Sequence, residues 1–289
     1  MRLSVIGWPI EHSLSPAMHT AALRRLAEAE PAFARWRYER EAVAPADLPR
    51  WIMATRGDRD RAGFNVTLPH KVAVAPLLDR LTPSAERIGA VNTVIRQGDA
   101  LVGDNTDAAG LMRSLEEAGI DVDRLDGTPV VLGAGGAARA AVIGLLDRGA
   151  SAVHVAARDA AKAESLARLG GPKASHGPLT RDALLRLTPS LILQASSASM
   201  DPQEGRALAE RVPLEAFQER GLAPAIVELV YRPRATPLLE RARSMGLPAV
   251  DGIGMLVHQG ALALTAWTGR DVDVAAMRAA VLDALASTG

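Results

Sequence analysis

The sequence contains no cysteine, and this absence excludes several kinds of chemistry. Without cysteine the 289-residue chain has no disulfide framework, no thiolate metal site and no thiol nucleophile. A metal site built from histidine is equally unsupported, because the six histidines show no close paired spacing. A chain without cysteine is consistent with a reducing compartment, and we expect a cytoplasmic protein.

Long apolar runs and an excess of charge of one sign are also missing. No uninterrupted apolar stretch approaches membrane-spanning length, and the first residues lack a charged leader followed by an apolar segment. The 33 acidic and 33 basic residues balance to zero net charge, and aromatic residues make up only 3% of the chain. We therefore expect no nucleic acid or membrane partner and instead a small-molecule substrate. Whether the chain is a monomer or a homodimer is left open.

Lysine is scarce as well, because only Lys71, Lys162 and Lys173 are lysines among the 33 basic residues. An arginine stays protonated in proteins, whereas a lysine amine can release its proton. A lysine in this chain therefore suggests a chemical role. The pattern over 63–78 predicts a strand that runs into a helix starting near Pro69, with Lys71 in its first turn. A cation is unfavourable at that end of a helix, which favours a role for Lys71 other than helix stability.

A glycine turn divides the chain near its middle. Val130, Val131 and Leu132 predict a buried strand, and Gly133, Gly135 and Ala138 then fill the spacing G-x-G-x-x-(G/A) before an alanine-rich helix. The free N–H groups at the start of such a helix bind phosphate. The turn therefore predicts a dinucleotide site, although a plain strand–helix connection has the same pattern.

The segment after this turn alternates strands with helices. Strands are expected over 152–157, 191–193 and 225–230, with a helix over 159–169, which indicates a Rossmann-like, doubly wound parallel sheet. Arg158 ends the second strand, where an arginine accommodates the 2′-phosphate of NADP. Asp159 instead suits the free ribose hydroxyl of NAD, or it caps the helix. Lys162, one turn later, favours NADP, and NAD remains possible.

The two ends of the chain predict a second domain. A strand over 2–6 and a hairpin over 90–103 lead to Asp107, which the local pattern also allows as the N-cap of a helix. Two helices after residue 252 have no strands of their own, so we expect them to pack on the N-terminal domain. The expected fold is therefore α/β and two-lobed, with a discontinuous substrate-binding domain over 1–106 and 253–289 and a dinucleotide-binding domain over 107–252.

Taken together, the ordered motifs resemble the shikimate dehydrogenase family along nearly the whole chain. The matching blocks lie at 7–9, 12–19, 65–71, 89–93, 105–107, 133–137, 230–239 and 252–259. The resemblance implies reversible reduction of 3-dehydroshikimate to shikimate with NADPH, and a catalytic pair formed by Lys71 and Asp107. It further implies substrate contacts from Ser13, Ser15, Asn65, Thr67, Asn92, Tyr231 and Gln259. The implied cofactor residues are Gly133, Ala134, Gly135, Gly136, Ala137, Arg158, Lys162 and Gly252.

Some positions depart from the family pattern, and other interpretations are open. Ala157 and Asp159 replace a usual asparagine and threonine beside Arg158, Gln194 replaces an asparagine, and Glu228 replaces an aspartate. A relative that oxidises quinate or a similar polyol acid with NAD is one alternative. A regulator that binds NADP without turnover is a remote one. The physiological role, aromatic biosynthesis or the use of shikimate or quinate as a carbon source, is also open.

Overall fold

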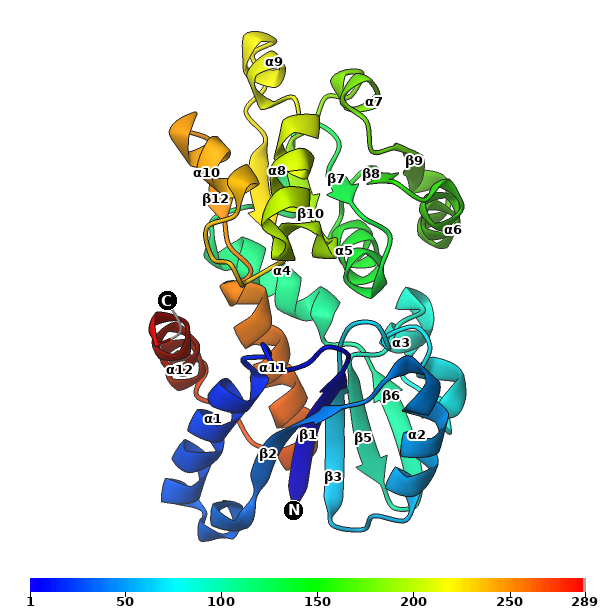
Figure 1. Cartoon of the computed structure of the whole chain (residues 1–289), viewed down its shortest axis with the longest axis vertical. Helices are drawn as coiled ribbons and strands as arrows, with labels where there is room; N and C mark the ends of the chain where they lie inside the picture. Colours follow the sequence, from blue (N-terminus) through cyan, green and yellow to red (C-terminus); the bar gives the residue numbers. More distant parts are fainter. Residues whose placement is uncertain (288–289) are drawn as a thin grey trace. The chain divides into compact units, whose positions relative to one another are not determined.

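The computed structural model describes residues 1–287, which form two compact units (Figure 1). The first unit contains Met1–Gly110 and the chain from Leu256 onward, and the second contains Leu111–Met255. The boundaries fall inside α4 (Asp107–Glu117) and α11 (Ile253–Thr268), a few residues after the predicted positions. Each of these two helices therefore contributes residues to both units.

The first unit is built on a mixed sheet. Among the described residues this sheet has six strands in the order β2-β1-β3-β5-β6-β4. β1 pairs in parallel with β2 and β3, while β5 is antiparallel to both β3 and β6, so the predicted hairpin is confirmed. The strands are β1 (Arg2–Gly7), β2 (Arg37–Ala42), β3 (Arg61–Val66), β4 (Arg80–Leu81), β5 (Thr93–Gln97) and β6 (Ala100–Asp104). The further helices of this unit are α1 (Ser15–Ala29), α2 (Leu48–Arg56), α3 (Pro83–Ile88) and α12 (Val274–Ala286).

The C-terminal helices pack closely on the N-terminal part of this unit. A Cβ on Gly260 of α11 would lie 2.4 Å from Cε of Met18 on α1, so the two helices meet at a residue without a side chain. α12 packs along α1, and Asp273 caps it by accepting from the backbone N–H of Ala276 at 2.9 Å. Both helices thus enclose the same core as the sheet.

The second unit holds a parallel sheet, as predicted. Its order within residues 111–255 is β12-β11-β10-β7-β8-β9, and every paired strand runs in the same direction. The strands are β7 (Val130–Leu132), β8 (Val153–Ala157), β9 (Ala174–Pro178), β10 (Leu191–Gln194), β11 (Ala225–Glu228) and β12 (Ala249–Val250). The helices are α5 (Gly136–Asp147), α6 (Ala160–Gly170), α7 (Arg181–Leu185), α8 (Pro202–Arg211), α9 (Leu214–Glu219) and α10 (Pro237–Ser244).

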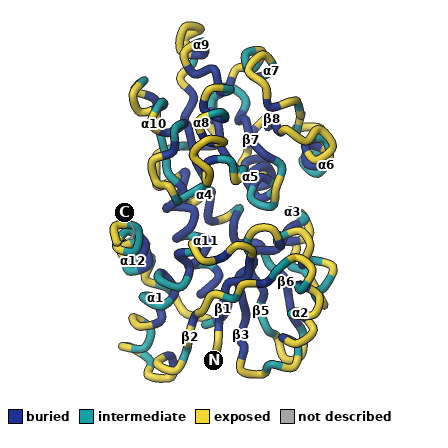
Figure 2. Tube along the Cα trace, in the orientation of Figure 1, coloured by how far each residue is buried: buried dark blue, intermediate teal, exposed yellow. Residues whose placement is uncertain are grey.

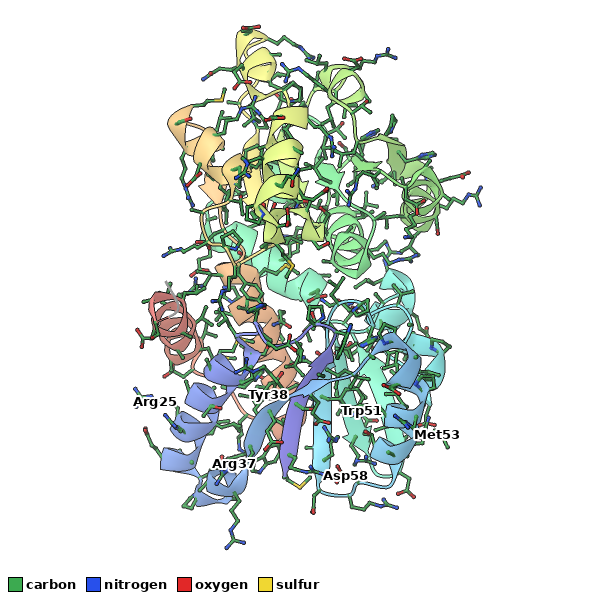
Figure 3. All side chains as sticks on the ribbon, viewed as in Figure 1. Arg25, Arg37, Tyr38, Trp51, Met53 and Asp58 are labelled. Atoms are coloured by element: carbon green, nitrogen blue, oxygen red, sulfur yellow. The ribbon has the colours of Figure 1, made fainter. Side chains whose placement is uncertain are left out.

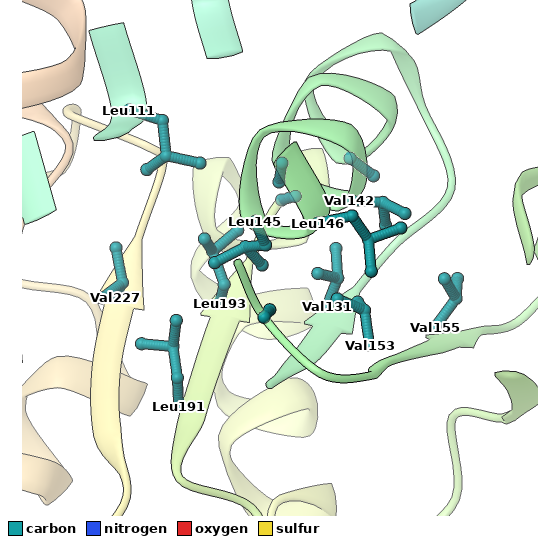
Figure 4. Packing of buried hydrophobic residues seen from close by; sticks show 14 of the residues in the cluster. Leu111, Val131, Val142, Leu145, Leu146, Val153, Val155, Leu191, Leu193 and Val227 are labelled. Atoms are coloured by element: carbon teal, nitrogen blue, oxygen red, sulfur yellow. The ribbon is translucent and has the colours of Figure 1, made fainter. Parts of the chain in front are cut away.

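The inner strands of this sheet are apolar on both faces, as expected for a parallel sheet covered by helices. Residues of β7 and β10 are buried throughout (Figure 2). Val131 and Leu193 lie beneath Val142 and Leu145 of α5 in one hydrophobic cluster (Figure 4). The glycine turn therefore follows a strand whose residues are all buried.

The helix predicted from Pro69 to Leu78 is not formed. The chain makes turns there, followed by a single 3-10 segment, η3 (Ala75–Leu77). Pro76 has no N–H group to donate to Val72, and the backbone oxygen of Lys71 accepts from the N–H of Val91 at 2.7 Å, so an α-helix does not run from Pro69 to Leu78. Lys71 therefore does not lie at the start of a helix, and no helix dipole acts on its amine there.

None of the helices within residues 1–287 is both long enough and apolar enough to cross a bilayer.

Candidate active site

Lys71 and Asp107 form a close ion pair in the first unit. The Lys71 Nζ donates to Oδ2 of Asp107 at 2.5 Å. Asp107 is the first residue of α4, two residues after β6, whereas Lys71 lies in the turns that follow β3. The lysine side chain keeps 18% of its surface exposed and the aspartate only 3%, so the lysine is the more accessible member of the pair.

Asn92 holds the second oxygen of this carboxylate. Its Nδ2 donates to Oδ1 of Asp107 at 2.8 Å and lies 3.2 Å from Oε1 of Gln259. Its own oxygen accepts from the backbone N–H of Thr106 at 2.8 Å, which fixes the orientation of the amide. Gln259 is anchored in turn, because its Nε2 donates to the backbone oxygen of Leu256 at 2.7 Å. The Asp107 carboxylate thus accepts from Lys71 and Asn92, and the alternative prediction that Asp107 is the N-cap of the helix is wrong, because it is the first helical residue.

Asn65 lies next to this network but is deeply buried. Its Nδ2 donates to the backbone oxygen of Asn92 and to Oγ1 of Thr93, both at 3.1 Å, while its oxygen accepts from the hydroxyl of Tyr38 at 2.6 Å. Both amide hydrogens are thus used inside the protein. Thr67, two residues further along the chain, is only partly buried, and among the described residues its hydroxyl has no hydrogen-bond partner.

Tyr38, which donates to Asn65, was not predicted from the sequence as part of this polar network (Figure 3). It comes from β2, and its ring stacks on His19 of α1 with centroids 4.1 Å apart and an interplanar angle of 9°. Burial lowers the pKa of His19 to about 3, so the imidazole is neutral beneath the tyrosine. No local pattern indicated Tyr38, because it is the single buried residue of β2 and its partner Asn65 lies on another strand.

The two serines of the N-terminal loop lie at the start of α1. The Oγ of Ser13 accepts from the backbone N–H of Ser15 at 3.3 Å. Ser15 is the first residue of the helix and Leu14 is its N-cap, so the Ser15 side chain does not cap the helix. Within residues 1–287 the Ser15 hydroxyl has no partner, which leaves it available to a ligand.

The glycine turn of the second unit has the form required for phosphate binding. Gly133 has φ +116°, a left-handed conformation that favours glycine. Gly135 is the N-cap of α5 and provides no capping side chain, so the first N–H groups of this helix are left for a ligand. A Cβ on Gly135 would point into open space. Gly136, Ala137 and Ala134 continue the same turn and helix start.

The two basic residues expected at the ribose are each paired with an acid. Nη1 of Arg158 donates to Oε2 of Glu204 at 2.7 Å, and Nζ of Lys162 lies 3.3 Å from Oδ2 of Asp159. Asp159 also caps α6, since its Oδ1 accepts from the backbone N–H of Lys162 at 3.0 Å. The alternative role of Asp159 as a helix cap is therefore confirmed.

The remaining predicted residues of the second unit lie around the end of β11. Tyr231 follows this strand and is partly exposed, and a Cβ on Gly252 would lie 2.5 Å from the backbone oxygen of Leu229. Glu228, a departure from the family pattern, is fully buried and accepts from the hydroxyl of Ser199 at 2.8 Å. Burial raises the pKa of Glu228 to about 7.

Metal ligation is not supported by the arrangement of side chains. Across residues 1–287, no three histidine, aspartate or glutamate side chains come together in a way that could hold an ion. Hence the groups available for chemistry are an amine, a carboxylate and the hydroxyls and amides around them.

Comparison with known proteins agrees with this geometry. Residues 5–94 match the shikimate dehydrogenase substrate binding domain, and residues 252–282 match the shikimate 5'-dehydrogenase C-terminal domain. The chain is 41% identical to the shikimate dehydrogenase (NADP(+)) of Geobacter metallireducens, over 98% of this chain and 96% of that protein.

Solved structures show the same similarity. Shikimate 5-dehydrogenase from Thermus thermophilus, in complex with NADP(H) and shikimate, is 38% identical with a TM-score of 0.83, over 99% of this chain and 100% of that one. Shikimate 5-dehydrogenase from Listeria monocytogenes, in complex with shikimate and NAD, is 30% identical with a TM-score of 0.81, over 96% and 95% of the two chains.

Proposed function

The chain belongs to the shikimate dehydrogenase family, and on that premise we propose that it catalyses the reversible, NADP-dependent reduction of 3-dehydroshikimate to shikimate. The observation that carries this function is the Lys71–Asp107 pair, with a partly accessible lysine and a carboxylate fixed by Asn92. A ketone that accepts a hydride becomes an oxyanion, so a proton donor must wait at that oxygen. NADPH supplies the hydride when it is bound.

The ion pair divides the work of proton transfer between its two members. Lys71 donates the proton to the developing oxyanion in the direction of reduction and accepts it in the direction of oxidation. Asp107 orients the amine by accepting a hydrogen bond from it. Asn92 in turn holds Asp107, since its amide donates to the carboxylate oxygen that Lys71 does not use.

Hydroxyl and amide side chains of the first unit support binding of a ligand with several hydroxyl groups. The hydroxyls of Ser15 and Thr67 have no partner among the described residues and are available to a ligand. Ser13 is hydrogen-bonded to the backbone of Ser15, and Asn92 is hydrogen-bonded to Gln259. A buried polyol must find a partner for each polar group, so this composition favours shikimate over an apolar acid. Asn65 acts by supporting Asn92 and Thr93 through its two amide hydrogens.

The two units have separate tasks in this proposal. The first unit binds the substrate and carries the catalytic pair. The second binds NADP, with its pyrophosphate at the uncapped start of α5 and its 2′-phosphate at Arg158 and Lys162; Gly252 belongs to the same site. We further propose a cytoplasmic location, which fractionation of the source cells would test.

Steady-state rates with shikimate and with quinate, each with NADP⁺ and NAD⁺, test the function directly. The expected result is the highest kcat/KM with shikimate and NADP⁺. A higher value with quinate, or no oxidation of either acid, would show the proposal to be wrong.

A further inference from the structure

We propose that Glu204, on α8, weakens binding of NADP relative to NAD by neutralising the arginine that receives the 2′-phosphate. This inference rests on the proposed function, because it assumes that a dinucleotide binds along β7, α5 and β8. It adds a residue outside the sequence motifs to the determinants of cofactor choice.

The position of Arg158 follows from the topology of the sheet. β7 and β8 are parallel neighbours, joined by the glycine turn and α5, and Arg158 is the first residue after β8. In such a βαβ unit the end of the second strand meets the adenosine ribose. A 2′-phosphate would therefore lie at Arg158, whereas the corresponding group of NAD is an uncharged hydroxyl.

Glu204 is held at this arginine by the start of its own helix. The backbone N–H of Glu204 donates to Oδ1 of Asp201, the N-cap of α8, at 2.9 Å. From the first turn of α8 its carboxylate accepts from Nη1 of Arg158 at 2.7 Å. The two side chains keep 49% and 62% of their surface exposed, so a ligand can reach the pair.

The local balance of charge is unfavourable for a phosphate. Lys162 is paired with Asp159, so the two cations at the ribose position face two carboxylates. A phosphate monoester carries a charge of about −1.5 to −2 at neutral pH. Its binding must either displace Glu204 from Arg158 or place two anions on one guanidinium, and neither cost arises with the hydroxyl of NAD.

The charge of Glu204 can be removed without disturbing a helix cap, whereas the charge of Asp159 cannot. Asp159 caps α6, so its replacement would disturb a helix as well as a charge. Glu204→Gln keeps a hydrogen-bond acceptor for Arg158 and removes only the charge. Glu210→Gln is the matched control, because Glu210 is an exposed acid on the same helix with no ion pair among the described residues.

The test measures nucleotide binding by calorimetry, with adenosine 2′,5′-bisphosphate and AMP as probes, at low and high salt. We expect Glu204→Gln to bind the bisphosphate about two- to fivefold more tightly at low salt, with less gain at high salt and no change for AMP. Glu210→Gln should match the parent. In steady-state kinetics, the KM for NADP⁺ should fall in Glu204→Gln while the KM for NAD⁺ is unchanged.

Several results would overturn this inference. Bisphosphate binding that is unchanged or weaker in Glu204→Gln would contradict it, as would an equal gain for AMP or an equal gain in Glu210→Gln. A parent protein that binds neither probe would refute the assumed nucleotide site and this inference with it. A parent that binds the bisphosphate but does not oxidise shikimate would instead refute the proposed function alone.

Discussion

At the residue scale, Asp107 is where the polar network of the first unit converges. One carboxylate oxygen accepts from the Lys71 amine and the other from the Asn92 amide. Asn92 is fixed by the backbone N–H of Thr106, so the direction of the Lys71 amine depends on a chain of hydrogen bonds within the protein. A site supported in this way keeps its geometry before the substrate arrives, which is the condition for efficient proton transfer.

Replacing Lys71 by arginine separates charge from proton release. Lys71→Arg keeps a cation beside Asp107, but a guanidinium does not release its proton at neutral pH. We expect kcat to fall by about 10²- to 10⁴-fold, the usual contribution of a general acid or base, while shikimate binding measured by calorimetry changes little. Lys173→Arg, an exposed lysine in the second unit, is the control and should leave both quantities unchanged. Retained turnover in Lys71→Arg would remove the lysine from the proton-transfer step.

Glu228 should make the stability of the protein depend on pH. Burial raises the pKa of Glu228 to about 7 in the folded protein, whereas the unfolded chain loses this proton near its ordinary value of 4.5. Between these values the unfolded state binds fewer protons than the folded state, so the free energy of unfolding falls as pH rises. Glu228→Gln should therefore match the parent near pH 4.5 and exceed its stability by as much as about 3 kcal/mol at pH 8.

The measurement is denaturant unfolding of both proteins at pH 5 and pH 8. Glu164→Gln, on the exposed side of α6, is the control for loss of one carboxylate. An equal change in stability with pH for the parent and Glu228→Gln would show that this carboxyl is ionised throughout the range.

At the scale of elements, the start of α5 combines two properties that can be varied independently. The helix has no side-chain cap, and a Cβ at Gly135 would meet nothing within 4 Å. The backbone of Gly135 is extended, with φ −87° and ψ −171°, so other residues fit there without strain. The fold therefore does not require glycine at this position.

Two substitutions at Gly135 distinguish these roles. Gly135→Ser and Gly135→Asp should both cap α5 and raise the stability of the apoprotein by about 0.3 kcal/mol. The aspartate also places a negative charge at the pyrophosphate position, so NADP⁺ affinity measured by calorimetry should fall by about tenfold or more relative to the serine variant. Equal NADP⁺ affinity in the two variants would place the pyrophosphate elsewhere.

Some helices and strands could be predicted from local sequence patterns and others could not. The strand, turn and helix over 130–147 were predictable because a buried apolar run, glycines at fixed spacing and an alanine-rich segment all favour the same local structure. The segment after Pro69 was predicted incorrectly because helical spacing of apolar residues was weighted above Pro76, which interrupts it. The two-residue strands β4 and β12 could not be predicted, since they depend on neighbours distant in sequence.

At the scale of the whole molecule, the site residues of the first unit come from widely separated parts of the chain. Local patterns indicated Lys71 and Asp107 individually, but their contact is formed only when β3 and the hairpin pair in one sheet. Tyr38 and Glu204 were missed for the same reason, because each acts on a residue that no local spacing connects to it.

The two ligands should protect different units from amide hydrogen exchange. We expect shikimate alone to slow exchange around residues 65–71 and 105–107 in the first unit, because it binds the substrate residues there. Adenosine 2′,5′-bisphosphate should instead slow exchange over 133–139 and 158–162 in the second unit. Mass spectrometry of peptic fragments measures both, with AMP as the comparison for the 2′-phosphate. Protection by shikimate confined to the second unit would contradict the division of tasks.

The turnover of Lys71→Ala, measured beside its affinity for shikimate, tests the central claim most directly. If Lys71 transfers the proton, oxidation of shikimate by NADP⁺ at saturating concentrations of both should be slower by about 10²-fold or more, while calorimetry shows shikimate affinity largely retained. If instead turnover is preserved and only shikimate affinity is lost, Lys71 is a binding residue, and the assignment of the Lys71–Asp107 pair to the chemical step is wrong.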